Sequence, residues 1–229
     1  MLILLVAATP FELAPTTQYL QKNFTDQKNG LYVKDKLRVQ LLVTGVGLVN
    51  TSFYLAKILA KTRPNFVINA GIAGAFTTDF KLGDVVQIVK ERFGDLGVEE
   101  ADGNFVDIHQ LKLVKSNEAP YEAGWLNNMA GNDFDFLPKV VGISVNKVHG
   151  AAPSIERITR KYAPDLETME SAAVFHACLL EELPFLAIRS ISNYVEPRNK
   201  DNWDIPLAIE ELNKVLVEML GSFVGATKA

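Results

Sequence analysis

Two glutamates and one arginine stand where a folded α/β chain would do chemistry. Glu12 follows the apolar segment Met1–Ala8, Glu170 precedes a long apolar stretch, and Arg189 interrupts an apolar run. A carboxylate can activate water or stabilise a developing positive charge. An arginine in a buried strand needs a partner, and Glu12 and Glu170 are the natural candidates. Two alternatives stay open: Glu12 complements a helix dipole, and Arg189 belongs to a structural ion pair.

The stretch behind Glu170 predicts a buried helix over Glu170–Glu182, because it is apolar on all sides. A carboxylate at the start of such a helix either caps its own helix or meets a polar ligand, and we favour the ligand. His176 and Cys178 in the same stretch are interpreted as core residues, since no partner pattern for a cysteine nucleophile is present.

Small residues follow two further apolar segments. Thr44-Gly45-Val46-Gly47 ends one of them, and Ala70–Ala75 (AGIAGA) follows Phe66–Asn69 as a predicted loop. Glycine lets a backbone approach a ligand closely, although a plain tight turn would look the same. A dinucleotide-binding fingerprint is disfavoured, because Asn50 stands where its third glycine would be.

Apolar runs alternate with helical patterns along the chain. Tight pairing of Leu31–Val33 with Arg38–Thr44 is expected, and Arg92–Pro138 is predicted to form long loops around the site. The alternation predicts a three-layer α/β/α sandwich with a mixed, mostly parallel central sheet, in one domain spanning 1–229. Ligands of such domains bind beyond the carboxyl ends of the strands. The predicted strands are Met1–Ala8, Arg38–Thr44, Phe66–Asn69, Asp84–Val89, Lys139–Val145 and Pro184–Ser192, and the predicted helices are 10–24, Asn50–Lys61, Ser154–Lys161, Glu170–Glu182 and Ile205–Phe223.

Composition excludes several classes of protein. The 229 residues carry a formal net charge of −4 with no basic cluster, which disfavours a nucleic-acid partner. Met1–Ala8 is too short for a membrane span and lacks a basic start, so we expect no membrane partner. The single cysteine fits a reducing compartment, and we expect a cytoplasmic protein. Three histidines without ligand spacing predict no metal.

Five motifs follow one another along the chain: TPFE, TGVG, NAGIAGA, TMESAAVFHAC and RSISN. In this order they resemble the purine nucleoside phosphorylase / methylthioadenosine–adenosylhomocysteine nucleosidase superfamily, from about Met1 to Gly221. Three further stretches are FGDLGVEE (Phe93–Glu100), SVNKVHG (Ser144–Gly150) and SNYVEPRN (Ser192–Asn199). Through these stretches the chain looks most like futalosine hydrolases within the superfamily. The resemblance implies an α/β sandwich, no cofactor and cleavage of an N-glycosidic bond in a small-molecule nucleoside.

The resemblance also implies roles at the sugar. Glu12 matches the carboxylate that activates the attacking water, and Arg189 matches an arginine near that water. Glu170 matches the carboxylate that holds the ribose hydroxyls, and Met169 matches the residue under the sugar. Together with Asn193, these residues are the candidate catalytic and sugar-binding set.

At the base, Ile72, Ala73, Gly74 and Val148 match pocket positions. Nucleosidases acting on adenine nucleosides carry Asp where this chain has Asn193, and often Ser where it has Ile72. An Asn amide can donate to N7 and to the O6 of a 6-oxopurine, whereas a 6-amino group would set donor against donor. The two departures therefore favour hypoxanthine as the leaving base.

Three further residues are assigned to the substrate or to its far end. Gly45 is a candidate for close backbone contact. Futalosine ends in a benzoate, and Arg198 and Lys147 are candidates for its carboxylate, with solvated surface charge as the alternative. Asn69 and Ala70 stand just ahead of the glycine stretch, where phosphorylases of the superfamily carry an arginine. Hydrolysis is therefore favoured over phosphorolysis.

The resemblance, together with Asn193, implies a hydrolase that cleaves futalosine to release hypoxanthine in menaquinone biosynthesis. The alternatives are a methylthioadenosine/adenosylhomocysteine nucleosidase, a purine nucleoside phosphorylase and, more remotely, a non-catalytic nucleoside-binding module. The last would leave Glu12 and Glu170 without a shared purpose. The resemblance also implies a homodimer or higher homo-oligomer, with Arg92–Pro138 as the candidate contact.

Overall fold

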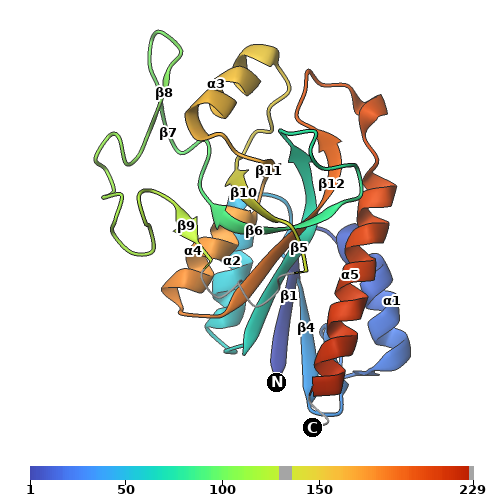
Figure 1. The fold of residues 1–229 in the computed structure, drawn as a ribbon. Helices are drawn as coiled ribbons and strands as arrows, with labels where there is room; N and C mark the ends of the chain where they lie inside the picture. The colour runs from blue at the N-terminus through green and yellow to red at the C-terminus, as the bar shows by residue number, and fades with distance from the viewer. Residues whose placement is uncertain (129–135, 227–229) are drawn as a thin grey trace.

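The computed structural model describes residues 1–128 and 136–226, and it is built around one large twisted sheet (Figure 1). The strands of this sheet are β1 (Leu2–Ala7), β2 (Thr25–Asp26), β3 (Leu31–Lys34), β4 (Leu37–Val43), β5 (Phe66–Ala75), β6 (Val85–Glu91), β9 (Leu126–Asn127), β10 (Lys139–Ser144), β11 (Leu166–Thr168) and β12 (Phe185–Tyr194). A separate small hairpin is formed by β7 (Gly97–Glu99) and β8 (Phe105–Asp107).

The sheet is mixed, with a parallel centre. Its order is β11-β10-β6-β12-β5-β1-β4-β3-β2, and β9 pairs with β6. The neighbours β12, β5, β1 and β4 run parallel, whereas β6 runs antiparallel to β12 and the β3–β4 hairpin is antiparallel as predicted. β11 also pairs antiparallel with the end of β5, which brings β10 and β11 over the centre of the sheet.

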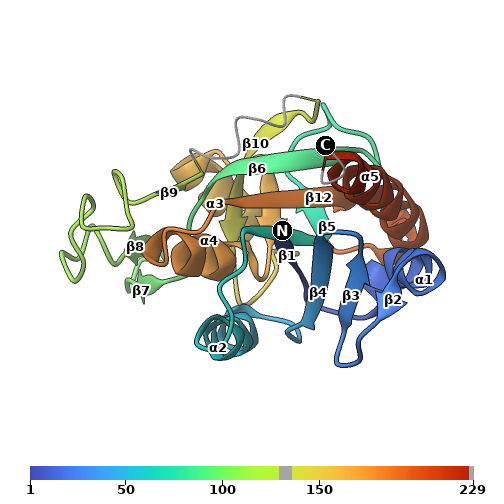
Figure 2. The same cartoon turned by 90° about the horizontal axis from the view of Figure 1, so that it is seen from below.

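Helices cover both faces, which confirms the predicted three-layer arrangement. In Figure 2, α2 and α4 lie on one side of the sheet, and α1 and α5 lie on the other. β1 explains the continuous apolar start of the chain: Leu4 and Val6 pack into one core, and Ile3 and Leu5 pack into the other. The helices are α1 (Ala14–Asn23), α2 (Leu48–Leu59), α3 (Ala152–Tyr162), α4 (Ser171–Leu180) and α5 (Ile205–Ala226). Within the described ranges, every helix is too short or too polar to cross a membrane.

The predicted glycine loop after Phe66–Asn69 is wrong, because β5 continues through it to Ala75. Gly71 pairs with Arg189 of β12, and Gly74 pairs with Asn193. Glycine signals a loop when it is judged alone, but here its missing side chain makes room for side chains from neighbouring elements. The small residues are thus part of the sheet that carries the site.

Two smaller differences lie at the first helix and in the middle of the chain. A 3₁₀ turn, Phe11–Leu13, precedes α1, so Glu12 sits in a tight turn rather than in a long helix. β11 was not predicted, since three residues are too few to show a period. Part of the predicted loop region Arg92–Pro138, namely 129–135, lies outside the described residues.

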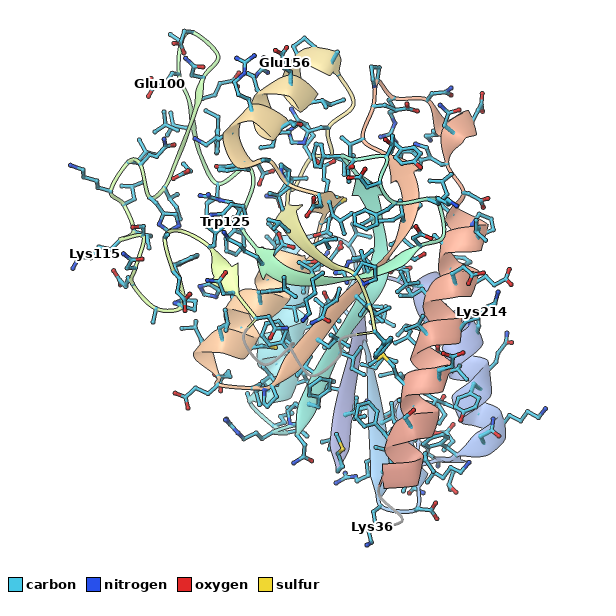
Figure 3. All side chains as sticks on the ribbon, in the orientation of Figure 1. Lys36, Glu100, Lys115, Trp125, Glu156 and Lys214 are labelled. Carbon is cyan, nitrogen blue, oxygen red and sulfur yellow. The ribbon has the colours of Figure 1, made fainter. Side chains whose placement is uncertain are left out.

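The parallel strands define two ends of the molecule. In Figure 3, Lys36 lies at the amino end of the strands, and Glu100 and Glu156 lie at the opposite end. The motifs after β1, in the last part of β5 and at the end of β12 all lie toward that opposite, carboxyl end, where parallel α/β folds bind ligands.

Candidate active site

A cavity of about 680 Å³ opens at the carboxyl ends of the central strands. It is bordered by β5, β11 and β12, by the turn after β1 and by the start of α5. Eight of the residues that the sequence assigned to the site line it: Glu12, Ile72, Ala73, Gly74, Val148, Met169, Glu170 and Asn193. The structure therefore brings most of the predicted set into one place.

Glu12 is almost fully buried, at 7% exposure, and is held from three directions. Its Oε2 accepts hydrogen bonds from the backbone N–H of Thr9 at 2.8 Å and from the Thr9 hydroxyl at 2.9 Å. Its Oε1 accepts from the backbone N–H of Ile72 at 3.3 Å. A carboxylate fixed in this way presents its remaining lone pairs to the cavity in one orientation, as a general base for water requires.

Gly71 makes this arrangement possible, because its neighbour is the carboxylate itself. A Cβ at Gly71 would lie 2.8 Å from Glu12 Oε1 and 3.5 Å from Arg189 Nε. Any side chain at this position would therefore displace Glu12 or Arg189.

Arg189 lies beneath the cavity and does not line it. The side chain is 2% exposed, and its guanidinium donates to Asn69 Oδ1 at 2.6 Å, Ser171 Oγ at 2.7 Å and the carbonyl of Ile188 at 2.7 Å. Glu12 and Glu170, the predicted partners, form no hydrogen bond or ion pair with it, because neutral groups take the guanidinium's hydrogen bonds. The two carboxylates act on Arg189 through their charge, and so does the buried Glu91.

Glu170 does not cap its own helix, which answers the question that the sequence left open. Its Oε1 instead accepts from the backbone N–H of Gly47, at the start of α2, at 2.9 Å. Gly47 adopts φ +96°, a conformation that favours glycine. The contact ties the carboxylate to a helix N-terminus, where negative charge is stabilised.

Burial raises the pKa of Glu170 above its usual value. The Gly47 N–H and the positive charge of Arg189 lower the pKa in part, and the negative charge of Glu12 raises it further. Two carboxylates thus share one buried guanidinium. Such a site carries spare negative charge, which suits a ligand that becomes cationic during its reaction.

Asn193 closes the other end of the cavity with a fixed amide. Its Nδ2 donates to the carbonyl of Tyr194 at 3.0 Å, and its Oδ1 accepts from the Ser192 hydroxyl at 2.9 Å. A Cβ at Gly74 would lie 3.1 Å from Nδ2, so the amide packs against a position that must stay small. The amide has a second N–H, which donates no hydrogen bond to the described residues.

Two of the predicted binding residues do not reach the cavity. Gly45 does not line it, and its neighbours Val46 and Gly47 take the wall position and the contact to Glu170. Arg198 is exposed and stacks its guanidinium over the Trp203 ring, 5.0 Å from the centroid. Gly45 and Arg198 were assigned from their positions along the chain. Position in the sequence does not predict the direction in which a loop points a residue.

Several lining residues were missed, among them Thr9, Glu167 and Trp203. Thr9 stands three residues before Glu12, a spacing typical of a side chain that folds back on a turn. Glu167 gave no signal of its own beside Glu170.

His176, predicted as a core residue, is half-buried beside Phe93 and Tyr121, and burial lowers its pKa. Cys178 is buried, as predicted, and burial raises its pKa to about 12.

Comparison with known proteins identifies the family of the chain. A family model described as the phosphorylase superfamily matches residues 2–221. The chain belongs to the phosphorylase superfamily.

Over residues 1–128 and 136–226, no group of three or more His, Cys, Asp or Glu side chains is arranged to hold a metal ion.

Curated relatives of the chain are nucleosidases. A 5'-methylthioadenosine/S-adenosylhomocysteine nucleosidase of Haemophilus ducreyi is 30% identical over 199 residues, 81% of each chain. A futalosine hydrolase of Thermus thermophilus is 28% identical over 189 residues, 82% of this chain and 83% of the relative. These relatives confirm the predicted enzyme type, an N-glycosyl hydrolase.

Solved structures confirm the fold. The native futalosine hydrolase of Helicobacter pylori superposes with a TM-score of 0.76 at 17% identity, covering 97% of this chain and 98% of that one. The Neisseria meningitidis 5'-methylthioadenosine/S-adenosylhomocysteine nucleosidase in complex with methylthio-immucillin-A gives a TM-score of 0.74 at 18% identity, covering 96% and 99%.

Replacing Glu12 and replacing Glu170 by glutamine should change kcat and KM in different ways. In Glu12→Gln, we expect kcat to fall by ~10²–10⁴-fold with ligand binding largely intact, because only the base for water is lost. In Glu170→Gln, kcat should fall and KM should rise together, because this side chain is expected to touch the sugar before and during bond cleavage. Release of free base from a cleaved nucleoside, followed by chromatography, measures both constants.

Glu210→Gln, an exposed change on α5, is the matched control and should leave both constants unchanged. Near-normal turnover in Glu12→Gln would remove Glu12 from the mechanism.

Proposed function

We propose that the protein hydrolyses the N-glycosidic bond of futalosine and releases hypoxanthine, as a cytoplasmic step of menaquinone biosynthesis. The proposal takes the whole chain, 1–229, as one nucleoside phosphorylase-like domain. The fixed amide of Asn193 carries the substrate assignment, and the similarity to the Thermus thermophilus futalosine hydrolase supports it.

The orientation of the Asn193 amide decides what the base end accepts. The Tyr194 carbonyl can only accept, so the nitrogen of the amide must face it and the amide cannot turn round without losing this bond. The remaining N–H is a donor that the neighbouring acceptors N7 and O6 of a 6-oxopurine can share. In a 6-aminopurine the same N–H would lie between N7 and the hydrogens of the 6-amino group, and an unmet buried donor costs about 1–3 kcal/mol, roughly tenfold or more in selectivity.

The proposed reaction uses three side chains. Glu12 removes a proton from water, whose oxygen bonds to C1′ of the ribose as the C1′–N9 bond breaks. The charge of Glu170 stabilises the positive charge that develops on the sugar. Asn193 donates to N7, where the negative charge of the leaving base collects, and N7 or N9 takes up the proton. The water attacks C1′ from the face opposite the base. On that face the carboxylate acts as a general base rather than as a nucleophile bonded to the sugar, as in inverting glycosidases.

The lining of the cavity supports water rather than phosphate as the nucleophile. Of the described residues that line it, none is Lys or Arg. A phosphate site needs converging cations or a cradle of backbone N–H groups. Asn69, in the region where phosphorylases carry an arginine, is 2% exposed and bonded to Arg189.

Two aromatic side chains in the cavity can contact the benzoate end of futalosine. Phe11 and Trp203 line the cavity, and Phe11 is 76% exposed. Arg198 lies over the outer ring of this wall, on Trp203. We keep Arg198 in the proposal as the cation for the benzoate carboxylate, held at the rim by its stacking on Trp203. Lys147 lines a different cavity, of about 720 Å³, and we no longer propose it for this contact.

A methylthioadenosine/adenosylhomocysteine nucleosidase is the second candidate. The Haemophilus ducreyi relative is the more similar of the two curated relatives compared, and the apolar side chains of Val46, Phe11 and Ile209 along the cavity suit a thioether chain.

Rates on futalosine, its 6-amino analogue, inosine and methylthioadenosine, with and without phosphate, separate the candidates. We expect fastest release of base from futalosine, at the same rate without phosphate and with free sugar as product. Asn193→Asp should move the preference toward the 6-amino analogue, because an Asp can accept from the 6-amino group.

Faster cleavage of methylthioadenosine by the unaltered enzyme would favour the second candidate. A requirement for phosphate, with a sugar phosphate as product, would make the enzyme a phosphorylase. Binding without release of base from any of the four nucleosides would leave only a binding module.

We also propose that two or more copies assemble. Exposed apolar side chains stand one helical turn apart on α2, with Val49 79% and Phe53 59% exposed. Leu96 and Leu113, in the predicted contact region, are exposed as well. Such a patch usually marks an interface. Light scattering should give at least twice the chain mass, and Phe53→Glu should reduce it. Lys22→Glu, an exposed change on α1 at the other side of the sheet, is the control and should not reduce it. A fully active monomer would contradict the assembly.

A further inference from the structure

Glu91 is a fully buried carboxyl group that the reaction described above does not use. It is the last residue of β6, at 0% exposure, and its Oε1 accepts from the backbone N–H of Arg92 at 3.0 Å. Its Oε2 has no hydrogen-bond partner within residues 1–128 and 136–226. A buried oxygen without a partner is costly, so its presence needs an explanation.

Gly142 of β10 leaves space for this carboxyl group. A Cβ at Gly142 would lie 2.7 Å from Glu91 Oε2, so a side chain at this position would displace the carboxyl group. Gly71 leaves space for Glu12 in the same way. The sheet therefore accommodates two buried carboxyl groups, one that lines the cavity and one that does not.

Ser171, the first residue of α4, connects Glu91 with Arg189. Its Oγ accepts from Arg189 Nη2 at 2.7 Å, and its hydroxyl lies close enough to Glu91 to lower the pKa of the carboxyl group. In the described part of the chain, the Ser171 hydroxyl donates to no acceptor. A hydroxyl can donate and accept at the same time, so Ser171 can donate to Glu91 while it accepts from Arg189.

A second hydroxyl near Glu91 holds the residues on either side of Glu170. The Ser144 hydroxyl also lowers the pKa of Glu91. Its Oγ accepts from the backbone N–H of Ala172 at 2.8 Å and shares a hydrogen bond of 2.8 Å with Thr168 Oγ1. The turn that carries Glu170 is thus held by hydroxyl groups that face Glu91.

We propose that Glu91 is a positioning residue for the reaction, which fixes Arg189 beneath the cavity through the Ser171 hydroxyl. Ser171 directly follows Glu170 in the chain, so the same contact fixes the carboxylate that is proposed to act on the sugar. The inference rests on the proposed function, because it takes the site to cleave a nucleoside. A neutral carboxyl group suits this place, since it can accept from Ser171 without competing for the charge of Arg189.

The groups around Glu91 make this role dependent on pH. Arg189 of β12 is the charged group that acts on Glu91, whereas the guanidinium of Arg92 is turned to Asp107 at 3.2 Å. β10 and α4 face Glu91 with hydroxyl groups, and β9 pairs with it through Leu126. Burial raises the pKa of Glu91 to about 8, so the neutral acid predominates at neutral pH.

The first test is the alkaline limb of the pH profile of kcat/KM for futalosine. As the pH rises through about 8, Glu91 ionises and takes a share of the positive charge of Arg189 that otherwise offsets Glu12 and Glu170. The guanidinium is then drawn toward Glu91 and its bond to Ser171 is weakened, so kcat/KM should fall.

Glu91→Gln cannot ionise but can still accept from Ser171. This variant should keep most of the activity at neutral pH, and its alkaline limb should move to higher pH or disappear. A role in stability alone would not move the limb. Glu156→Gln, exposed on α3, is the matched control and should leave the limb in place.

The second test removes the hydroxyl between the two groups. Ser171→Ala should lower kcat/KM roughly tenfold and move the limb to higher pH, because the hydroxyl that lowers the pKa of Glu91 is lost. Glu91→Leu should lower kcat/KM by a similar factor. The double variant should lose no more than the worse single variant, because both changes break the same contact.

A limb at the same pH in the unaltered enzyme, Glu91→Gln and Ser171→Ala overturns the role of Glu91 while leaving the hydrolase in place. A double variant whose loss equals the product of the two single losses overturns it as well. Where Glu91→Gln does not fold, the midpoint of the limb in Ser171→Ala decides. An unaltered enzyme that releases no base from futalosine overturns the proposed function itself, and the role of Glu91 with it.

Discussion

The site depends on the burial of one guanidinium in the middle of a parallel sheet. Arg189 stands in β12, at 2% exposure, where an uncompensated charge would cost several kcal/mol. Its hydrogen bonds go to Asn69, Ile188 and Ser171, so its positive charge is left to act through space on the carboxylates above it. Glu12 and Glu170 can stay together in an apolar cavity because this charge lies beneath both.

A third carboxylate, Glu91, also lies close enough to Arg189 to interact with its charge. Glu91 is fully buried near Arg189, and burial raises its pKa to about 8, so the acid is mostly protonated at neutral pH. It therefore adds little negative charge beside Arg189 there, and the guanidinium is shared between Glu12 and Glu170. In the proposed reaction, the negative charge of Glu170 then acts on the positive charge that forms on the sugar.

The sequence predicted those parts of the fold that are set by local patterns. β1 is a continuous apolar run because both of its faces are buried, and α4 is apolar on all sides for the same reason. The extent of β5 could not be predicted, because the glycines in it are explained only by neighbours far along the chain: Glu12 against Gly71, and Asn193 against Gly74. β11 depends on pairing with β5 and β10, so its three residues left no period to detect.

The same distinction holds for the site. Glu12, Glu170 and Asn193 could be found because each follows or precedes an unmistakable element. The partners of Arg189 could not, since Asn69 and Ser171 are ordinary residues until the fold brings them to the guanidinium. Glu167 was missed because β11 shows no pattern of its own, and only the pairing of β11 with β5 brings Glu167 to the cavity.

The central claim is that an ionised, buried Glu170 stabilises the sugar as it becomes positive, and the pH dependence of kcat/KM tests it most directly. Burial raises the pKa of Glu170 above 4.5, so activity should be lost as the pH falls through that raised value and the carboxylate becomes neutral. We predict an acid limb with a midpoint above 4.5, which moves or disappears in Glu170→Gln. A midpoint at or below 4.5, or an unchanged midpoint in that variant, would contradict the account.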